Sequence, residues 1–92
     1  MKEDAIEAAL TRAVKDAGGL CWKLVSPGTA GVPDRICLKD GRIVFVEVKA
    51  PGKTPRPIQH HRLAQLTAQG FTALVIDQPN QIREVLDALS AV

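Results

Sequence analysis

Three charged side chains fall on what reads as one β-hairpin, with a spacing that suits chemistry on a phosphodiester. Residues 32–49 hold a strand-like run on each side of Asp40-Gly41, a dipeptide that strongly favours a two-residue hairpin turn. The register that this turn sets places Asp34 directly opposite Glu47. Lys49 lies two residues beyond Glu47 and therefore projects from the same face. The hairpin thus predicts a cluster of two acids and one amine.

Two carboxylates in such a cross-strand pair would have Cβ atoms roughly 4.5–5.5 Å apart, an arrangement that is destabilising without a positive charge between them. A divalent cation is the expected partner. Carboxylate oxygens favour Mg²⁺ or Mn²⁺ over zinc. Such an ion orients a phosphate, lowers the pKa of a bound water and stabilises developing negative charge. Lys49 would add a compact positive charge beside that water. Metal-dependent phosphodiester hydrolysis is the predicted chemistry.

An acid on the predicted first helix, residues 3–17, is the fourth candidate. Glu7 lies about 20° from Val14 and about 60° from Leu10 around a helix of 3.6 residues per turn. An acid on the inward margin of an amphipathic helix needs a partner, and Glu7 could hold a second ion or a water on the first. The alternative is a solvated helix face. Glu3 lies on the same stripe, but a first turn that frays makes a functional role less favoured there.

The charge distribution favours a nucleic-acid partner more than the net charge of +2 does. Residues 48–76 contain no Asp or Glu. A local basic stripe of this kind can neutralise phosphates. The predicted DNA-contacting residues in it are Lys53, Arg56, His60 and Arg62. A solvated basic loop is the alternative. His60 and His61 do not predict zinc, because adjacent helix positions point about 100° apart and no cysteine has suitable spacing.

The composition is that of one small domain, residues 1–92, with an aliphatic core. Cys21 and Cys37 both fall in strand-like runs, which favours buried thiols in a reducing compartment. No apolar run approaches the roughly 20 residues of a membrane span, and the acidic, mixed N-terminus does not resemble a signal peptide. We expect a cytoplasmic protein, without a membrane partner, in a bacterial or virus-infected cell.

The elements that would position these residues follow the order αβββαβα, an α/β fold with a mixed sheet of about four strands flanked by helices. The strand at 43–48 is apolar on both faces, which is typical of a central strand. The other expected elements are a strand at 20–25, a loop at 26–33, a loop at 50–57, a helix from Pro57 to near Gly70, a strand at 71–76 and a last helix from Pro79.

The motifs Glu7, Gly31-Val32-Pro33-Asp34, Glu47-Val48-Lys49 and Gln59 resemble those of the PD-(D/E)XK nuclease superfamily. Within it the chain is most similar to stand-alone, virus-type members of the VRR-Nuc family, which is related to archaeal-type Holliday junction resolvases. The resemblance covers roughly residues 3–77 and implies a restriction-endonuclease-like αβββαβ core, with the last helix added to it.

The resemblance also implies roles for single residues. Asp34 and Glu47 would be metal ligands, with the backbone carbonyl of Val48 completing the coordination. Lys49 would be the catalytic lysine, and Glu7 the helix-borne acid. Gln59 would orient the site or contact the phosphate. Isolated domains of this kind are expected to be homodimers that cut branched DNA.

The residues and the resemblance together predict an Mg²⁺- or Mn²⁺-dependent, structure-selective DNA endonuclease. That it resolves four-way (Holliday) junctions as a homodimer is what the resemblance implies. Two identical sites related by a two-fold axis suit paired cuts in two symmetric strands. Three alternatives stay open at this point. One is a nuclease for flaps or other branched intermediates of repair and recombination. The others are a non-catalytic nucleic-acid-binding module and a subunit that cuts only with a partner.

Overall fold

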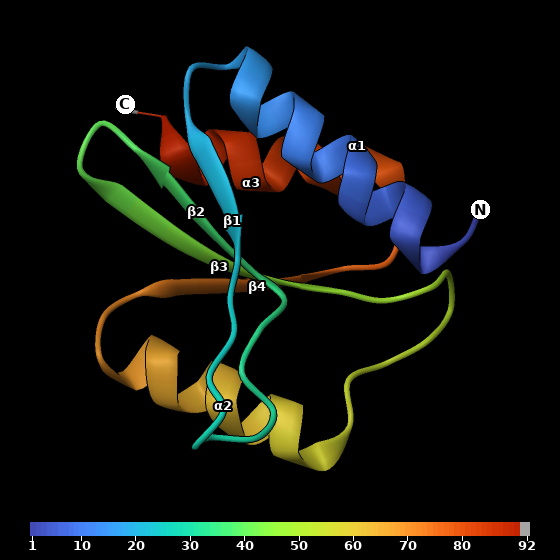
Figure 1. The fold of residues 1–92 in the computed structure, drawn as a ribbon, viewed down its shortest axis with the longest axis vertical. Coiled ribbons are helices and arrows are strands. Elements are labelled where there is room, and N and C mark those ends of the chain that lie inside the picture. The colour runs from blue at the N-terminus through green and yellow to red at the C-terminus, as the bar shows by residue number, and fades with distance from the viewer. Residues whose placement is uncertain (91–92) are drawn as a thin grey trace.

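A computed structural model describes residues 1–90 and shows a four-stranded sheet between two layers of helix (Figure 1). Helices α1 and α3 lie together on one side of the sheet, and α2 lies on the other. The elements in chain order are α1 (Glu3–Asp16), β1 (Leu20–Lys23), β2 (Arg35–Lys39), β3 (Arg42–Val48), α2 (Pro57–Ala68), β4 (Thr72–Ile76), a 3-10 turn (Pro79–Gln81) and α3 (Ile82–Leu89). The predicted α/β class and element order are confirmed.

The hairpin turn between β2 and β3 forms as predicted. Asp40 has φ 49° and Gly41 has φ 79°, the pair of positive φ angles that defines a type I′ turn. This turn pairs Lys39 with Arg42 and Arg35 with Val46. The predicted register is therefore confirmed along the whole ladder.

Strand β3 is central, as its apolar character on both faces predicted. The sheet order is β1-β2-β3-β4, with the first two pairings antiparallel and the pairing of β3 with β4 parallel. A parallel neighbour requires a crossover connection, and α2 with its flanking loops provides it. The hairpin of β2 and β3 is thus fixed on one side by β1 and on the other by β4.

The face of the sheet toward α1 and α3 holds the dry core. Val44, Val46 and Val48 project there from β3 and are at most 1% exposed. The helices cover them with fully or nearly fully buried side chains: Ile6, Leu10 and Val14 from α1, and Ile82, Val85 and Leu89 from α3. Burial of this kind contributes roughly 25 cal/mol per Å² of apolar surface. The first and last helices are therefore held on the sheet by hydrophobic packing.

The opposite face of the sheet is organised in rows of cross-strand neighbours. Near the turn, Leu20, Leu38 and Ile43 form the first row, and Trp22, Ile36 and Phe45 form the second. Helix α2 covers this face only in part, since Leu20 is 50% exposed and Trp22 is 57% exposed. Trp22 is therefore not a core residue. The next row on this face begins with the two acids of the hairpin.

Several boundaries differ by one or two residues from the sequence-based expectation. Strand β1 ends at Lys23 and not at Val25, and β4 begins at Thr72. The last helix is preceded by a separate 3-10 turn over Pro79–Gln81, in which Pro79 occupies the first position, where a missing N–H costs no hydrogen bond. Within residues 1–90, no helix has the length and apolar character that a membrane crossing requires.

Candidate active site

Asp34 and Glu47 meet at the open end of the hairpin. Asp34 immediately precedes β2, and continuing the ladder one pair beyond Arg35 and Val46 places it opposite Glu47. Its carboxylate accepts a hydrogen bond from the backbone N–H of Val48, with 2.8 Å between Oδ2 and N. The structure therefore fixes the Asp34 side chain against β3, on the face of the sheet that carries Phe45.

Glu47 is a buried charge with one free oxygen. Its side chain is 1% exposed, and its Oε2 lies 3.1 Å from Nζ of Lys49. Its Oε1 is buried without a hydrogen-bond partner among the described residues. Burial is the main cause that raises the pKa of Glu47. The negative charges of Asp34 and Glu3 raise it further, while Lys49 opposes the shift. A cation beside Oε1, in addition to the Lys49 ammonium beside Oε2, would give this buried oxygen a partner.

These residues fit a hard divalent cation and do not fit a zinc cage. An unpaired buried acceptor is rare and requires an explanation, one of which is an ion. Proteins bind Mg²⁺ through one or two carboxylates, and the ion keeps several of its waters. Two acids and a backbone carbonyl such as that of Val48 would provide ligands of this kind. Within residues 1–90, no group of three or more His, Cys, Asp or Glu side chains is arranged to hold a metal.

The structure does not bring Glu7 to this pair. Its Oε2 lies 2.7 Å from Nε of Arg35 and 3.8 Å from Nζ of Lys23. Arg35 pairs with Val46, whose side chain is in the core beneath α1, so the Glu7 contacts lie on the face opposite to that of Glu47. The role of Glu7 in metal binding stays a prediction, and its contacts favour a structural role.

The helix acid that acts electrostatically on Glu47 is Glu3. It is one of the two acids whose negative charge raises the pKa of Glu47. Sequence reasoning set Glu3 aside because it lies in the first turn of the helix. The signal that could have separated the two acids is Arg35: as the neighbour of Asp34 it must project to the other face, where it is available to Glu7.

Gln59 lies in the first turn of α2 and has a structural contact of its own. Its side-chain oxygen accepts a hydrogen bond from the backbone N–H of Arg56 at 2.8 Å, and the residue is 8% exposed. This bond satisfies a backbone donor at the start of the helix. The predicted role of Gln59 in orienting the site stays a prediction, and capping α2 is the role that its contacts show.

The predicted DNA-contacting residues divide into two groups. Lys53, Arg56 and His60 are exposed around the loop before α2 and at its start. Arg62 is half-buried, and its Nε donates to the carbonyl oxygen of Ala30 at 2.8 Å. Arg62 therefore ties the loop before Asp34 to α2. The first three side chains are the ones that remain exposed to a phosphate.

Comparisons with known proteins point in one direction. Profiles of known families gave no match to the chain. A protein named "Putative nuclease p44", from Acyrthosiphon pisum secondary endosymbiont phage 1, is 43% identical over 91 residues, which cover 98% of this chain and 97% of that protein. A solved structure described as "VRR_NUC domain" superposes with a TM-score of 0.87 at 26% identity, over 98% of this chain and 99% of its own. A second, described as "VRR_NUC domain protein", has a TM-score of 0.76 at 19% identity, covers 97% of this chain and 88% of its own, and shows the fold alone.

The fold and the site together define a restriction-endonuclease-like domain of the PD-(D/E)XK type, in which a hairpin presents two acids and a lysine on one face. A relative that aligns over 97% of its own length is a phage protein with a nuclease name. This chain belongs to the VRR-Nuc family of nucleases.

Proposed function

We propose that this chain is an Mg²⁺- or Mn²⁺-dependent, structure-selective DNA endonuclease. The observation that carries the proposal is the buried carboxylate of Glu47, which has one oxygen on Lys49 and the other without a partner among the described residues, across the hairpin from Asp34. A stable protein keeps such a group where function requires it. The phage relative, with its nuclease name, supports the same reading.

In this proposal Asp34 and Glu47 hold the ion, with the carbonyl of Val48 as a third protein ligand. When bound, the ion would polarise the scissile phosphate as a Lewis acid and lower the pKa of a water, so that hydroxide is available as the nucleophile at neutral pH. The Val48 N–H holds the Asp34 carboxylate in position through the 2.8 Å hydrogen bond. Lys49, whose ammonium lies 3.1 Å from Glu47, supplies positive charge where the phosphoryl oxygens gain negative charge.

Glu3 is the helix acid that we propose for this site. Its negative charge raises the pKa of Glu47, which supports a role for Glu3 in holding a water on the ion. Glu7 acts through Arg35, which follows Asp34 in the chain, and so supports the strand that presents the metal ligand. Lys53, Arg56 and His60, all exposed, are the proposed contacts to the DNA backbone.

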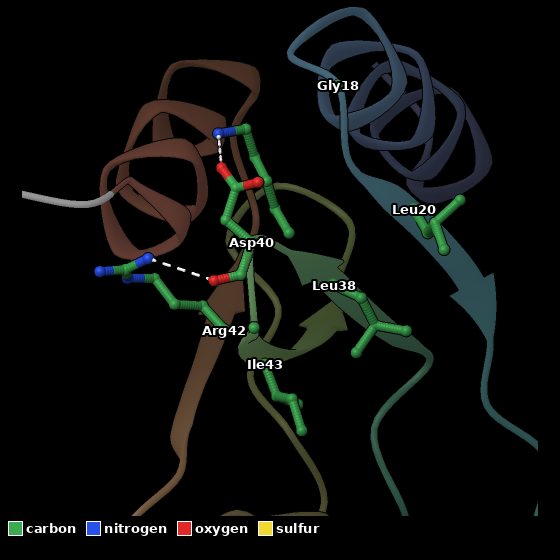
Figure 2. Close-up of a pocket in the computed structure, with 8 residues that line it drawn as sticks. Gly18, Leu20, Leu38, Asp40, Arg42 and Ile43 are labelled. Carbon is green, nitrogen blue, oxygen red and sulfur yellow. Dashed lines mark hydrogen bonds and ion pairs between the residues drawn. The ribbon is translucent and has the colours of Figure 1, made fainter.

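The proposed substrate is branched DNA, with a four-way junction first, cut by a homodimer. The partly uncovered sheet face offers a surface for a second copy. Leu20, Leu38 and Ile43 line a hollow of about 400 Å³ beside the hairpin turn, and Figure 2 shows these three side chains along the neighbouring strands. Trp22, 57% exposed in the next row, extends this apolar surface. Such surfaces mark sites of association, and a two-fold axis through this one would give two symmetric active sites. We propose the cytoplasm of an infected bacterium as the place of action, which the phage origin of the relative supports.

The test is cleavage of linear, flap and four-way DNA by the purified chain with Mg²⁺, with Mn²⁺ and with a chelator. We expect metal-dependent cutting of branched DNA. Asp34→Asn, Glu47→Gln and Lys49→Ala should each lower the rate at least about 10²-fold, the usual cost of removing a charge-stabilising group.

Asp40→Asn and Glu84→Gln are the matched controls, because both remove exposed acids far from the cluster. Circular dichroism would establish that all five variants fold. Unchanged cleavage by the three site variants would remove the proposed site. Binding of branched DNA without cleavage under any metal would replace the enzyme with a binding module.

A further inference from the structure

We propose that Cys21 and Cys37 form a reactive dithiol, in which Cys21 attacks small-molecule disulfides and Cys37 then closes a cross-strand disulfide between β1 and β2. Neither residue belongs to the nuclease site. Both side chains lie on the face of the sheet that packs against α1, opposite to the face that carries Glu47.

The backbone register places the two residues for a covalent bond. Cys21 and Cys37 are direct partners in the antiparallel pairing of β1 with β2, and their sulfur atoms are 3.7 Å apart. Directly opposed residues in such pairs have Cα atoms about 4.5–5.5 Å apart, which lies within the 4.4–6.8 Å range of disulfides. A side-chain rotation that closes the sulfur atoms to about 2.0 Å would suffice.

The two thiols differ in access, which gives each a separate role. Cys21 is half-buried on the edge strand β1, whereas Cys37 is 0% exposed on β2 beneath α1. Of the two residues, only Cys21 therefore has exposed surface through which a disulfide in solution could approach. This arrangement makes Cys21 the attacking residue and Cys37 the resolving residue.

The hydrogen bonds make the accessible sulfur the more acidic one. The thiol of Cys37 donates to Sγ of Cys21, and this bond lowers the pKa of Cys21 to about 6 while raising that of Cys37. The hydroxyl of Thr11, 3.8 Å from Sγ of Cys21, adds to the lowering. Among the charged groups around Cys21, Arg35 of β2 lowers its pKa and Glu7 of α1 raises it. Lys23, two residues after Cys21 on β1, is paired with Glu7.

The chemistry balances with a small-molecule disulfide such as oxidised glutathione as the oxidant. The Cys21 thiolate attacks one sulfur of that disulfide, forms a mixed disulfide and releases one glutathione thiolate. The Cys37 sulfur then attacks Sγ of Cys21 and its proton passes to the second glutathione, which is expelled as a thiol. The protein loses two electrons and two protons, and the oxidised glutathione gains both.

The test uses the full chain and oxidised glutathione, followed by intact mass spectrometry. Wild type should lose two hydrogen atoms without a lasting adduct. Cys37→Ser should accumulate one glutathione on Cys21, and Cys21→Ser should react at least about tenfold more slowly. The rate for wild type should rise with pH around a midpoint near 6, where an ordinary cysteine reacts with a midpoint near 8.5.

A stability measurement on wild type alone keeps the proposal testable if a serine variant folds poorly. Closing the loop between the two residues constrains the unfolded chain, so oxidation should raise the urea midpoint and dithiothreitol should restore it. Equal reactivity of the two single variants, or a wild-type adduct that never closes, would overturn the proposal.

Discussion

Glu47 is a carboxylate kept where carboxylates are normally unstable. It is 1% exposed, one of its oxygens lacks a partner among the described residues, and the nearest opposite charge is that of Lys49 at 3.1 Å. Burying a charge with incomplete pairing costs free energy that the fold must offset elsewhere. In the absence of metal, Glu47 therefore lowers the stability of the protein, and this cost has a measurable pH dependence.

The pH dependence follows from the direction of the shift. Burial raises the pKa of Glu47 in the folded state above 4.5, so the native protein holds this proton more tightly than the unfolded chain does. Stability from this group is present at low pH and is lost as pH rises through the folded-state pKa. We expect the metal-free Glu47→Gln variant to lack this loss, with Glu84→Gln as control. Urea denaturation at pH values between 4 and 8 measures this loss of stability. An equal loss in wild type and in Glu47→Gln would contradict the assignment.

A divalent cation should reverse the same cost. An ion that binds only the folded state stabilises it by about 2.7 kcal/mol at one hundred times its dissociation constant. For a domain of this size, each kcal/mol raises the melting temperature by about 4–8 °C. We expect Mn²⁺ to raise the melting temperature of wild type and not that of Asp34→Asn, as followed by circular dichroism. An equal rise in both proteins would place the ion elsewhere.

The pairing of the two hairpin acids was predicted from the turn, whereas the partner of Glu7 was not predicted. A type I′ turn fixes the register, so Asp40-Gly41 alone determines which residues face each other. Helix α1 has no such fixed relation to the sheet. Its side chains meet β2 only through tertiary packing, and whether Glu3 or Glu7 reaches the acidic pair depends on where along the sheet the helix lies.

At the level of elements, the ion pair between Glu7 and Arg35 joins α1 to β2. Both side chains are at most 20% exposed and their atoms are 2.7 Å apart. Hydrogen bonds to charged groups contribute about 1.5–3 kcal/mol. In a double-mutant cycle of Glu7→Ala with Arg35→Ala, we expect a coupling free energy of unfolding in that range. The cycle isolates the pair from other effects of each mutation.

The Glu7→Ala variant also tests the predicted role of Glu7 in metal binding. A structural Glu7 leaves the affinity for Mn²⁺ unchanged in Glu7→Ala, as measured by calorimetry. Loss of Mn²⁺ binding in Glu7→Ala, with binding kept in Glu3→Ala, would restore the prediction made from the sequence and would remove Glu3 from the site.

The loop before Asp34 depends on close packing at one glycine. Gly31 has φ +84°, and a Cβ there would lie 2.8 Å from Cγ1 of Ile58 and 3.1 Å from its backbone carbon. We expect Gly31→Ala to destabilise the protein by about 1–3 kcal/mol, the cost of a strained backbone conformation. Gly28→Ala, in the same loop with open space around it, should change stability by no more than about 0.5 kcal/mol. Urea denaturation compares the two, and equal effects would exclude this packing as the cause.

Element boundaries were predicted to within a few residues where a turn former marks them. Gly18-Gly19 ends the first helix, and Pro57 begins α2. The end of β1 was missed, because Leu24 and Val25 have the strand-like character of the residues before them. Leu24 still donates its N–H to the carbonyl oxygen of Asp34, at 2.9 Å, so one hydrogen bond between the two segments lies beyond the end of β1.

For the whole molecule, the two faces of the sheet differ in how completely they are covered. Helices α1 and α3 cover one face of the sheet. On the other face, only Gln59 and Leu63 of α2 are buried, and Trp22 of β1 remains exposed. The sequence could not show this, because Ile58, Leu63 and Leu66 on α2 look like an ordinary apolar stripe. How far a crossover helix extends over a sheet depends on the loops that lead to it.

The proposed homodimer places a second copy on this uncovered face. We expect Trp22→Glu to give a monomer by light scattering, because a charge at the centre of an apolar contact remains without a partner. Val25→Glu is the control: Val25 is 70% exposed but lies in the loop after β1, outside the two apolar rows. A wild-type monomer, or a dimer that survives Trp22→Glu, would contradict this surface.

The parallel pairing of β3 with β4 has a consequence for the route by which the chain folds. The hairpin of β2 and β3 closes over a two-residue turn, whereas β4 can pair only after the whole of α2 has crossed the sheet. Contacts near in sequence form first, since loop closure costs little entropy. We therefore expect the hairpin to form early, so that the repulsion between Asp34 and Glu47 arises before most of the native surface is buried. A cation taken up at that moment would speed folding as well as stabilise its product, so the availability of metal would govern how fast a new chain matures.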